Sequence, residues 1–169
     1  IDDRIGVADS PSLVLTQSLS IEAWVKASPP AVSGQGHGLI FFRGDDRGGV
    51  DPYYLTLSEG GVLQFTVNNA SNASGGVQAP LPIGQWVHVV GTLDDATGQM
   101  SLYLNSVLVS QFTTTVRPYA SLDPSSNPGV GIGSHGGYPS TPHRFLFTGQ
   151  IDELRLYDHA LSAAEVSAH

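Results

Sequence analysis

Apolar and polar residues alternate in one short segment after another, which is the period-two pattern of half-buried β-strands. Residues 19–26 show it most clearly, because Leu19, Ile21, Ala23 and Val25 share one face and the intervening positions the other. The pattern predicts strands at residues 19–26, 39–42, 53–57, 62–67, 86–93, 100–109, 129–133 and 145–156. Strands this short and this regularly spaced are typical of a sandwich.

Turn signals separate these segments. Asp94 to Gly98 forms a five-residue link that suits a hairpin, and residues 104–107 suit a further tight turn. The stretches 27–38 and 68–82 are of low complexity and are predicted to be loops. Near the end, Ser162 followed by Glu165 predicts a capped helical turn. The predicted fold is therefore all-β: a two-sheet antiparallel β-sandwich, a jelly roll, with a short C-terminal helical turn.

Composition supports one domain over residues 1–169. The chain has 40% apolar and 13% charged residues, with 20 glycines and 11 prolines, which suits strands and turns and argues against disorder. Fifteen acidic and seven basic residues make the net charge −8 without a basic cluster, so nucleic acid is an improbable partner. No segment approaches the roughly 20 apolar residues that a membrane-spanning helix needs, so no membrane insertion is expected.

Five segments in order resemble a known family. They are VADSPSL (7–13), LSIEAWV (19–25), QWVHVVGT (85–92), MSLYLN (100–105) and FTGQIDELRLY (147–157), the last followed by ALS at 160–162. Together they resemble the laminin G-like jelly rolls of the concanavalin A-like lectin and glucanase superfamily.

The resemblance implies two antiparallel sheets with a curved face. It also implies a glycan-binding, adhesive or accessory module of a secreted or cell-surface protein. Family members usually begin with one more strand, so we expect this chain to be one domain of a larger protein with flanking domains.

The resemblance also implies a calcium ion, where the loop after the first strand meets the start of the last strand. It assigns the ligands to Asp9, the carbonyl of Ser12, Asp152 and, more weakly, Gln150, and calcium favours such oxygen ligands. Two alternatives stay open. Asp9 could cap the turn through Ser10 and Pro11, and Asp152 could pair with an arginine or accept from backbone amides.

Sugar binding requires an exposed aromatic face beside amide, carboxylate or guanidinium groups. Loop aromatics and their polar neighbours are the candidates, although each alone also fits an ordinary loop residue. Those predicted to contact a ligand are His37, Arg43, Tyr53, Tyr54, His135 and Tyr138. Trp24 and Trp86 are predicted instead to pack within the core or under loops.

Three other polar features are interpreted structurally. Asp45, Asp46 and Asp51 lack the spacing of an EF-hand and are predicted to form a solvated loop. Glu22 and Arg155 lie on neighbouring strands in the family arrangement and are predicted to pair across them. His88 is predicted to be a structural strand residue.

Glycosidases need two carboxyl groups spaced across the bond they break. Asp152 and Glu153, as strand neighbours, are predicted to point to opposite sides, so we expect no catalytic activity. The first functional prediction is a calcium-stabilised module that binds a glycan, and the alternative is a protein-interaction or architectural spacer domain with an extracellular protein partner. Exposed loop aromatics would favour the former and a flat aliphatic patch the latter.

Overall fold

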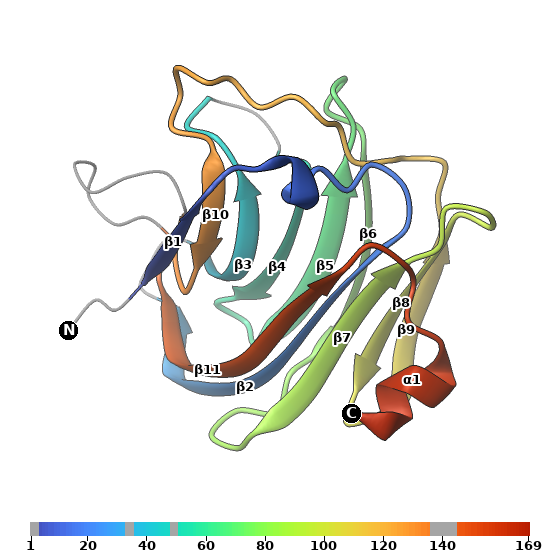
Figure 1. Ribbon diagram of the computed structural model, residues 1–169. Coiled ribbons are helices and arrows are strands. Elements are labelled where there is room, and N and C mark those ends of the chain that lie inside the picture. The colour runs from blue at the N-terminus through green and yellow to red at the C-terminus, as the bar shows by residue number, and fades with distance from the viewer. Residues whose placement is uncertain (1–3, 33–35, 48–50, 136–144) are drawn as a thin grey trace.

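Two antiparallel sheets face each other in the computed structural model, which describes residues 4–32, 36–47, 51–135 and 145–169 (Figure 1). The elements in chain order are β1 (Ile5–Ala8), the 3-10 turn η1 (Pro11–Leu13), β2 (Leu19–Val32), β3 (His37–Gly44), β4 (Tyr53–Ser58), β5 (Val62–Asn68), β6 (Ser74–Pro80), β7 (Val87–Leu93), β8 (Gln99–Leu104), β9 (Val107–Thr113), β10 (Gly129–Ile132), β11 (Phe147–Tyr157) and α1 (Ala163–Ala168). The predicted two-sheet sandwich with a short C-terminal helix is confirmed.

The strand order shows which strands form each sheet and supply the core between them. Sheet A has six strands in the order β1-β10-β3-β4-β5-β6, and sheet B has five in the order β11-β2-β7-β8-β9. Inward side chains of both sheets form one apolar cluster, with Ile21 and Val89 from sheet B meeting Leu55 and Phe65 from sheet A. Because strand side chains alternate, the residues between these core positions face outward on each sheet.

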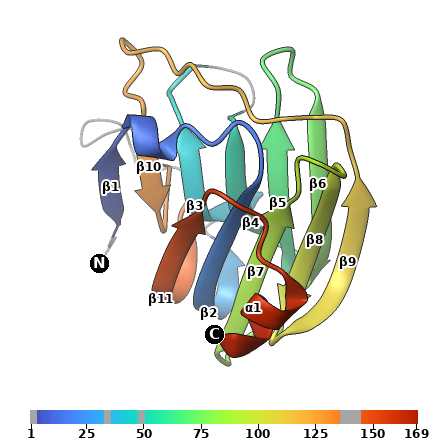
Figure 2. The ribbon, with the colours of Figure 1, turned by 45° about the vertical axis from the view of Figure 1, so that its right-hand side comes forward.

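Helix α1 covers part of the outward face of sheet B (Figure 2). Leu161 and Val166 pack with Val90 and Tyr103 in a second, smaller apolar cluster. The helix begins with the predicted capping box, in which Ser162 accepts from the backbone N–H of Glu165 and the Glu165 carboxylate accepts from the backbone N–H of Ser162. The C-terminal segment is thus tied to the sheet by both packing and capping.

The connection from β9 to β10 runs across one end of the sandwich, over the ends of both sheets (Figure 1). The segment after β1 lies at the same end, where the Tyr53 hydroxyl donates to the carbonyl of Leu13 at 2.6 Å. We call this the closed end. Among the described residues, no helix has the length and apolar character needed to span a membrane.

Three predicted boundaries were wrong. Residues 27–32, predicted as loop, continue β2, and residues 74–80 within the second predicted loop form β6. The predicted strand 100–109 is divided by a turn at Asn105 and Ser106, where both residues have positive φ. That turn joins β8 to β9 and is the one the sequence suggests at residues 104–107.

Candidate functional site

The outward face of sheet A over strands β3 to β6 is the part of the molecule that gathers aromatic and amide side chains. Strand register places Phe42, Tyr54 and Thr66 side by side on that face. The adjacent row, Phe41, Leu55 and Phe65, belongs to the core. We call the outward surface of β3 to β6 the sheet A face.

A row of rings runs along β3 on the sheet A face. His37 stacks on Phe145 with ring centroids 4.4 Å apart and planes 10° from parallel. His135 lies 4.4 Å from the ring of Phe42 and 6.2 Å from that of Phe145. The structure therefore brings together two of the predicted ligand residues, His37 and His135, through rings that the sequence analysis did not select. We call these four residues the aromatic row.

Neutral polar side chains cover the neighbouring strands. Thr56, Gln64 and Gln78 share one outward row by register, and the side-chain amide of Gln64 donates to that of Gln78 at 2.6 Å. Tyr54 is half-buried on β4, one outward row along the strand from Thr56. A flat ring beside planar amides is the arrangement that suits stacking on and hydrogen bonding to a hydroxyl-rich ligand.

Arg43 and Tyr53 contradict their prediction as accessible ligand contacts. Both side chains point into the sandwich and have 0% exposure. Arg43 donates to both carboxylate oxygens of Asp9, at 2.9 and 3.0 Å, and to the carbonyl of Ala120 at 3.1 Å. The physical reason is the strand alternation: Tyr54 and Phe42 take the outward positions, so their neighbours must point inward.

Asp45 ties two loops together at the closed end. Its carboxylate accepts from the guanidinium of Arg47 at 2.6 and 2.8 Å and from the backbone N–H of Asp123 at 2.9 Å. Burial alone would raise the pKa of Asp45, but these hydrogen bonds hold it below its usual range. The nearby Asp46 carboxylate lies 3.3 Å from His135, so the same loop touches the aromatic row.

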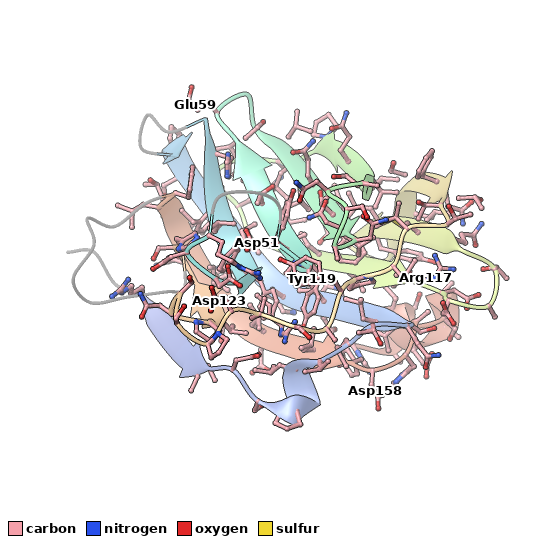
Figure 3. All side chains as sticks on the ribbon, turned by 90° about the horizontal axis from the view of Figure 1, so that it is seen from above. Asp51, Glu59, Arg117, Tyr119, Asp123 and Asp158 are labelled. Atoms are coloured by element: carbon pink, nitrogen blue, oxygen red, sulfur yellow. The ribbon has the colours of Figure 1, made fainter. Side chains whose placement is uncertain are left out.

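Asp51 lies beside the same end of the sheet A face. Its carboxylate accepts from the backbone N–H of Asp45 at 3.3 Å and sits over Gly44, where a Cβ would collide with its Oδ1 atom. Burial, reinforced by the charge of Asp45, raises the pKa of Asp51 to about 7. Burial and these two carboxylates also raise the pKa of Tyr119 to about 12. Figure 3 looks onto this end and shows Asp51, Tyr119 and Asp123 close together.

The prediction of a solvated acidic loop was therefore wrong for Asp45, which is 2% exposed, and for Asp51. These carboxyl groups hold the closed end together. Asp46 is exposed, as predicted.

The four residues predicted to bind calcium are divided between the two sheets. Asp9 follows β1 and is engaged by Arg43, and the Ser12 hydroxyl bonds to that of Ser10. Asp152 and Gln150 lie exposed on β11 in sheet B, where Asp152 accepts from the backbone N–H of Glu153. In the part of the chain that the structure describes, no three His, Cys, Asp or Glu side chains form a metal-binding group. Calcium binding by Asp9, Ser12, Gln150 and Asp152 therefore stays a prediction.

Sheet B carries a buried polar cluster around Glu22. Its carboxylate lies 2.7 Å from His88 Nε2, 3.1 Å from His169 Nδ1 and 2.5 Å from the Tyr157 hydroxyl, which donates to it. Burial works against the charge, yet the hydrogen bonds from Tyr157 and His88 leave the Glu22 pKa lowered. Arg155 pairs with Glu22 across the strands, with 3.8 Å between Nη1 and Oε2, which confirms the predicted ion pair. His88 is 3% exposed and structural, as predicted.

Of the two tryptophans, Trp24 packs beside His88 with ring centroids 5.2 Å apart. Trp86 is 40% exposed, so its predicted burial was wrong. Tyr138 lies outside the described residues. The sequence analysis missed four residues of the sheet A face: Phe42, Phe145, Gln64 and Gln78. The alternation of inward and outward positions within the predicted strands 39–42 and 62–67 was the available signal for Phe42 and Gln64.

Comparison with known proteins places the chain by family and fold. The family model described as the concanavalin A-like lectin/glucanases superfamily matches residues 2–167, in agreement with the resemblance inferred from the sequence. A search of curated proteins gave no match.

Among solved structures, a Bacteroides ovatus ATCC 8483 protein proposed to bind carbohydrate is 20% identical with a TM-score of 0.69. That alignment covers 97% of this chain but 43% of the other. The CBM40 module of the Ruminococcus gnavus IT-sialidase, bound to α2,3-sialyllactose, is 15% identical over 98% of this chain and 95% of its own, with a TM-score of 0.72. The K499G mutant of the NanB sialidase from Streptococcus pneumoniae is 21% identical over all of this chain and 26% of its own, with a TM-score of 0.71. At these identities the similarity establishes the fold.

Proposed function

Because the chain belongs to the concanavalin A-like lectin/glucanases superfamily, we propose that it is a non-catalytic glycan-binding module that uses the sheet A face. The half-buried ring of Tyr54, which lies beside the aromatic row and the paired amides of Gln64 and Gln78, carries this proposal. Solved structures of the same fold include a carbohydrate-binding module with a bound oligosaccharide, which supports it.

The chemistry of the face agrees with a sugar ligand. Sugar rings present C–H groups that pack on an aromatic ring, and their hydroxyls bond to amides and other planar polar groups. Tyr54 offers the ring, and Gln64 and Thr66 offer donors and acceptors on the next strand. We expect the affinity to be weak, in the range of about 10 μM to 1 mM on the general scale of affinities.

Glycan binding and its dependence on Tyr54 form the test. The wild-type protein is screened on a glycan array, and the best ligand is titrated by calorimetry against wild type and Tyr54→Ala. We expect a loss of at least about tenfold in affinity, because removal of a stacking ring costs about 1.4 kcal/mol or more.

Trp86→Ala is the matched control, because it removes another exposed ring away from the sheet A face and should leave binding unchanged. Thermal unfolding of each variant checks that the fold is intact. Equal affinity in wild type and Tyr54→Ala would exclude the sheet A face as the binding surface.

A protein-interaction domain is the second candidate, and strand β9 favours it. This edge strand of sheet B has no charged residue, and four large apolar side chains on it are exposed: Val107, Leu108, Val109 and Phe112. An edge of this kind can pair with an extended segment of another chain. A β9 variant with Val109→Lys that loses a protein partner but keeps glycan binding would separate the two functions.

Calcium, a secreted or cell-surface location and flanking domains stay predictions that rest on the family resemblance. Thermal unfolding with calcium and with chelator tests the first, since an ion that binds only the folded state raises its stability. A lower midpoint with chelator in wild type, absent in Asp152→Ala, would support calcium, and equal midpoints would exclude it.

A further inference from the structure

We infer that the sheet A face selects uncharged glycans and discriminates against glycans that carry a carboxylate, such as sialylated ones. This inference rests on the proposed function and names the ligand class of the same site. The observation behind it is the distribution of charge around the face.

The face itself is neutral. None of the residues that register places outward along strands β3 to β6 is Lys, Arg, Asp or Glu. They include His37, Leu39, Phe42, Tyr54, Thr56, Ser58, Val62, Gln64, Thr66, Gly76, Gln78 and Pro80. The titratable groups among them are a tyrosine and His37, and burial lowers the pKa of His37, which favours its neutral form.

Carboxylates stand at both ends of the face. Asp51 precedes β4 and Glu59 follows it, and Figure 3 labels both. Asp46 adds a third at the end that Asp51 occupies, next to His135. At pH 8, above the Asp51 pKa of about 7, a negative ligand on this surface would meet like charges at either end, in a protein whose net charge is −8.

The described arginines nearest this face are already paired with carboxylates. Arg43 points inward and holds Asp9, and Arg47 holds Asp45. A carboxylate ligand is normally held by an arginine fork or a lysine. Arg43 is 0% exposed, and rebinding it to a ligand would leave Asp9 without its partner. In Arg47 the fork formed by Nε and Nη2 is already occupied by Asp45.

The other described cations lie off β3 to β6. Lys26 and Arg155 are on sheet B, Arg117 pairs with Asp95 beside the β7–β8 turn, and Arg4 precedes β1. The face is therefore built to bind hydroxyl and C–H groups. Arg144 lies outside the described residues, so the test includes it.

The experiment uses an array of glycans in matched pairs that differ only by a terminal sialic acid. We expect each bound neutral glycan to bind at least about tenfold tighter than its sialylated counterpart, at low salt. The difference should narrow at high salt, on the order of 0.5 M NaCl, because salt screens the repulsion between exposed charges.

Two variants test the cause. In the double variant Asp51→Asn with Glu59→Gln, the discrimination should shrink, because two carboxylates at the ends of the face become neutral amides of similar size. Arg144→Ala should not change the preference.

The outcomes separate the two claims. Equal or tighter binding of sialylated glycans would overturn this inference and leave the proposed function standing. Binding of no glycan of either kind would overturn the proposed function and the inference with it. A clearly stronger preference for neutral glycans in Arg144→Ala would show that Arg144 attracts the carboxylate in the wild type and would overturn the argument from the described charges.

Discussion

Single residues decide which side of sheet A faces outward, where a ligand could bind, and which side packs in the core. Tyr53 and Tyr54 are neighbours of identical chemistry, yet one donates to Leu13 inside the sandwich and the other faces outward. The sequence analysis selected both tyrosines as ligand contacts, whereas the structure buries Tyr53 in the same row as the charged Arg43. The ion pair with the partly buried Asp9 explains how an arginine occupies a core position.

Asp51 is the residue whose ionisation is expected to affect stability most directly. Its pKa is about 7 in the folded protein, against 3.8 for an aspartate in the unfolded chain. Between these values the folded state binds more protons, so the free energy of unfolding falls as pH rises from about 4 to 7 and stays low above that. The loss is at most about 4 kcal/mol, because a tenfold change in proton affinity corresponds to about 1.4 kcal/mol.

Asp51→Asn should remove this dependence and raise stability at pH 8. Urea unfolding from pH 5 to 8.5 measures it, with the exposed Asp158→Asn as the control. A pH profile of the Asp51→Asn protein that parallels wild type would show that another group titrates here.

Whole elements were predicted well where the alternation was strong and poorly where glycine or proline diluted it. β7 has the sequence VHVVGTL, with apolar residues at most positions, and was found from sequence, whereas β6 has the sequence SGGVQAP and was taken for a loop. Pairing with β5 makes residues 74–80 a strand. In this register Val77 and Ala79 pack in the core, while the glycines and Gln78 complete the hydrogen-bonded edge. Pairing with a neighbouring strand cannot be read from a local pattern.

At the scale of elements, Glu22 links β2 to β7, β11 and α1. Its carboxylate is 1% exposed and accepts hydrogen bonds from groups on these elements or beside them. In Glu22→Gln an NH2 group, which can only donate, replaces one of the two accepting oxygens, so it faces other donors. We expect a loss of about 1–3 kcal/mol at pH 7.

The pH dependence of that loss has a definite sign. Because the folded pKa of Glu22 is lowered from 4.5, the contribution of its charge is present above that value and fades as pH falls through the folded pKa. The difference between wild type and Glu22→Gln should therefore shrink in acid. Urea unfolding at pH 7 and pH 3.5 checks this, with Glu59→Gln as the exposed control, and a difference that grows in acid would contradict the assignment.

At the scale of the whole molecule, the two sheets pack closely at a glycine, which has no side chain to hold them apart. Gly91 lies in the middle of β7, and a Cβ there would be 2.5 Å from Cγ of Phe65 on the opposite sheet. The sequence places both residues in strands but does not show that they meet across the core. Such a contact between distant segments is the part of a fold that single-sequence patterns leave open.

Gly91→Ala should therefore destabilise the protein by about 2–3 kcal/mol through overpacking, although alanine suits a strand better than glycine does. Gly60→Ala is the control, because its Cβ would meet only the Ser58 hydroxyl, at 3.7 Å. Chemical unfolding of both variants measures the difference. A Gly91→Ala protein as stable as wild type would mean that the sheets can separate slightly without cost.

The cross-link made by Asp45 also has a consequence for how a ligand would bind. The loops that it joins are tied to each other before any ligand arrives, so the described rim at the closed end has little conformational entropy left to lose. Association at this end should then occur as a single kinetic phase, with a heat-capacity change that reflects only the contact area. The rim then works as a rigid frame, and the affinity would be set by how much surface the sugar buries.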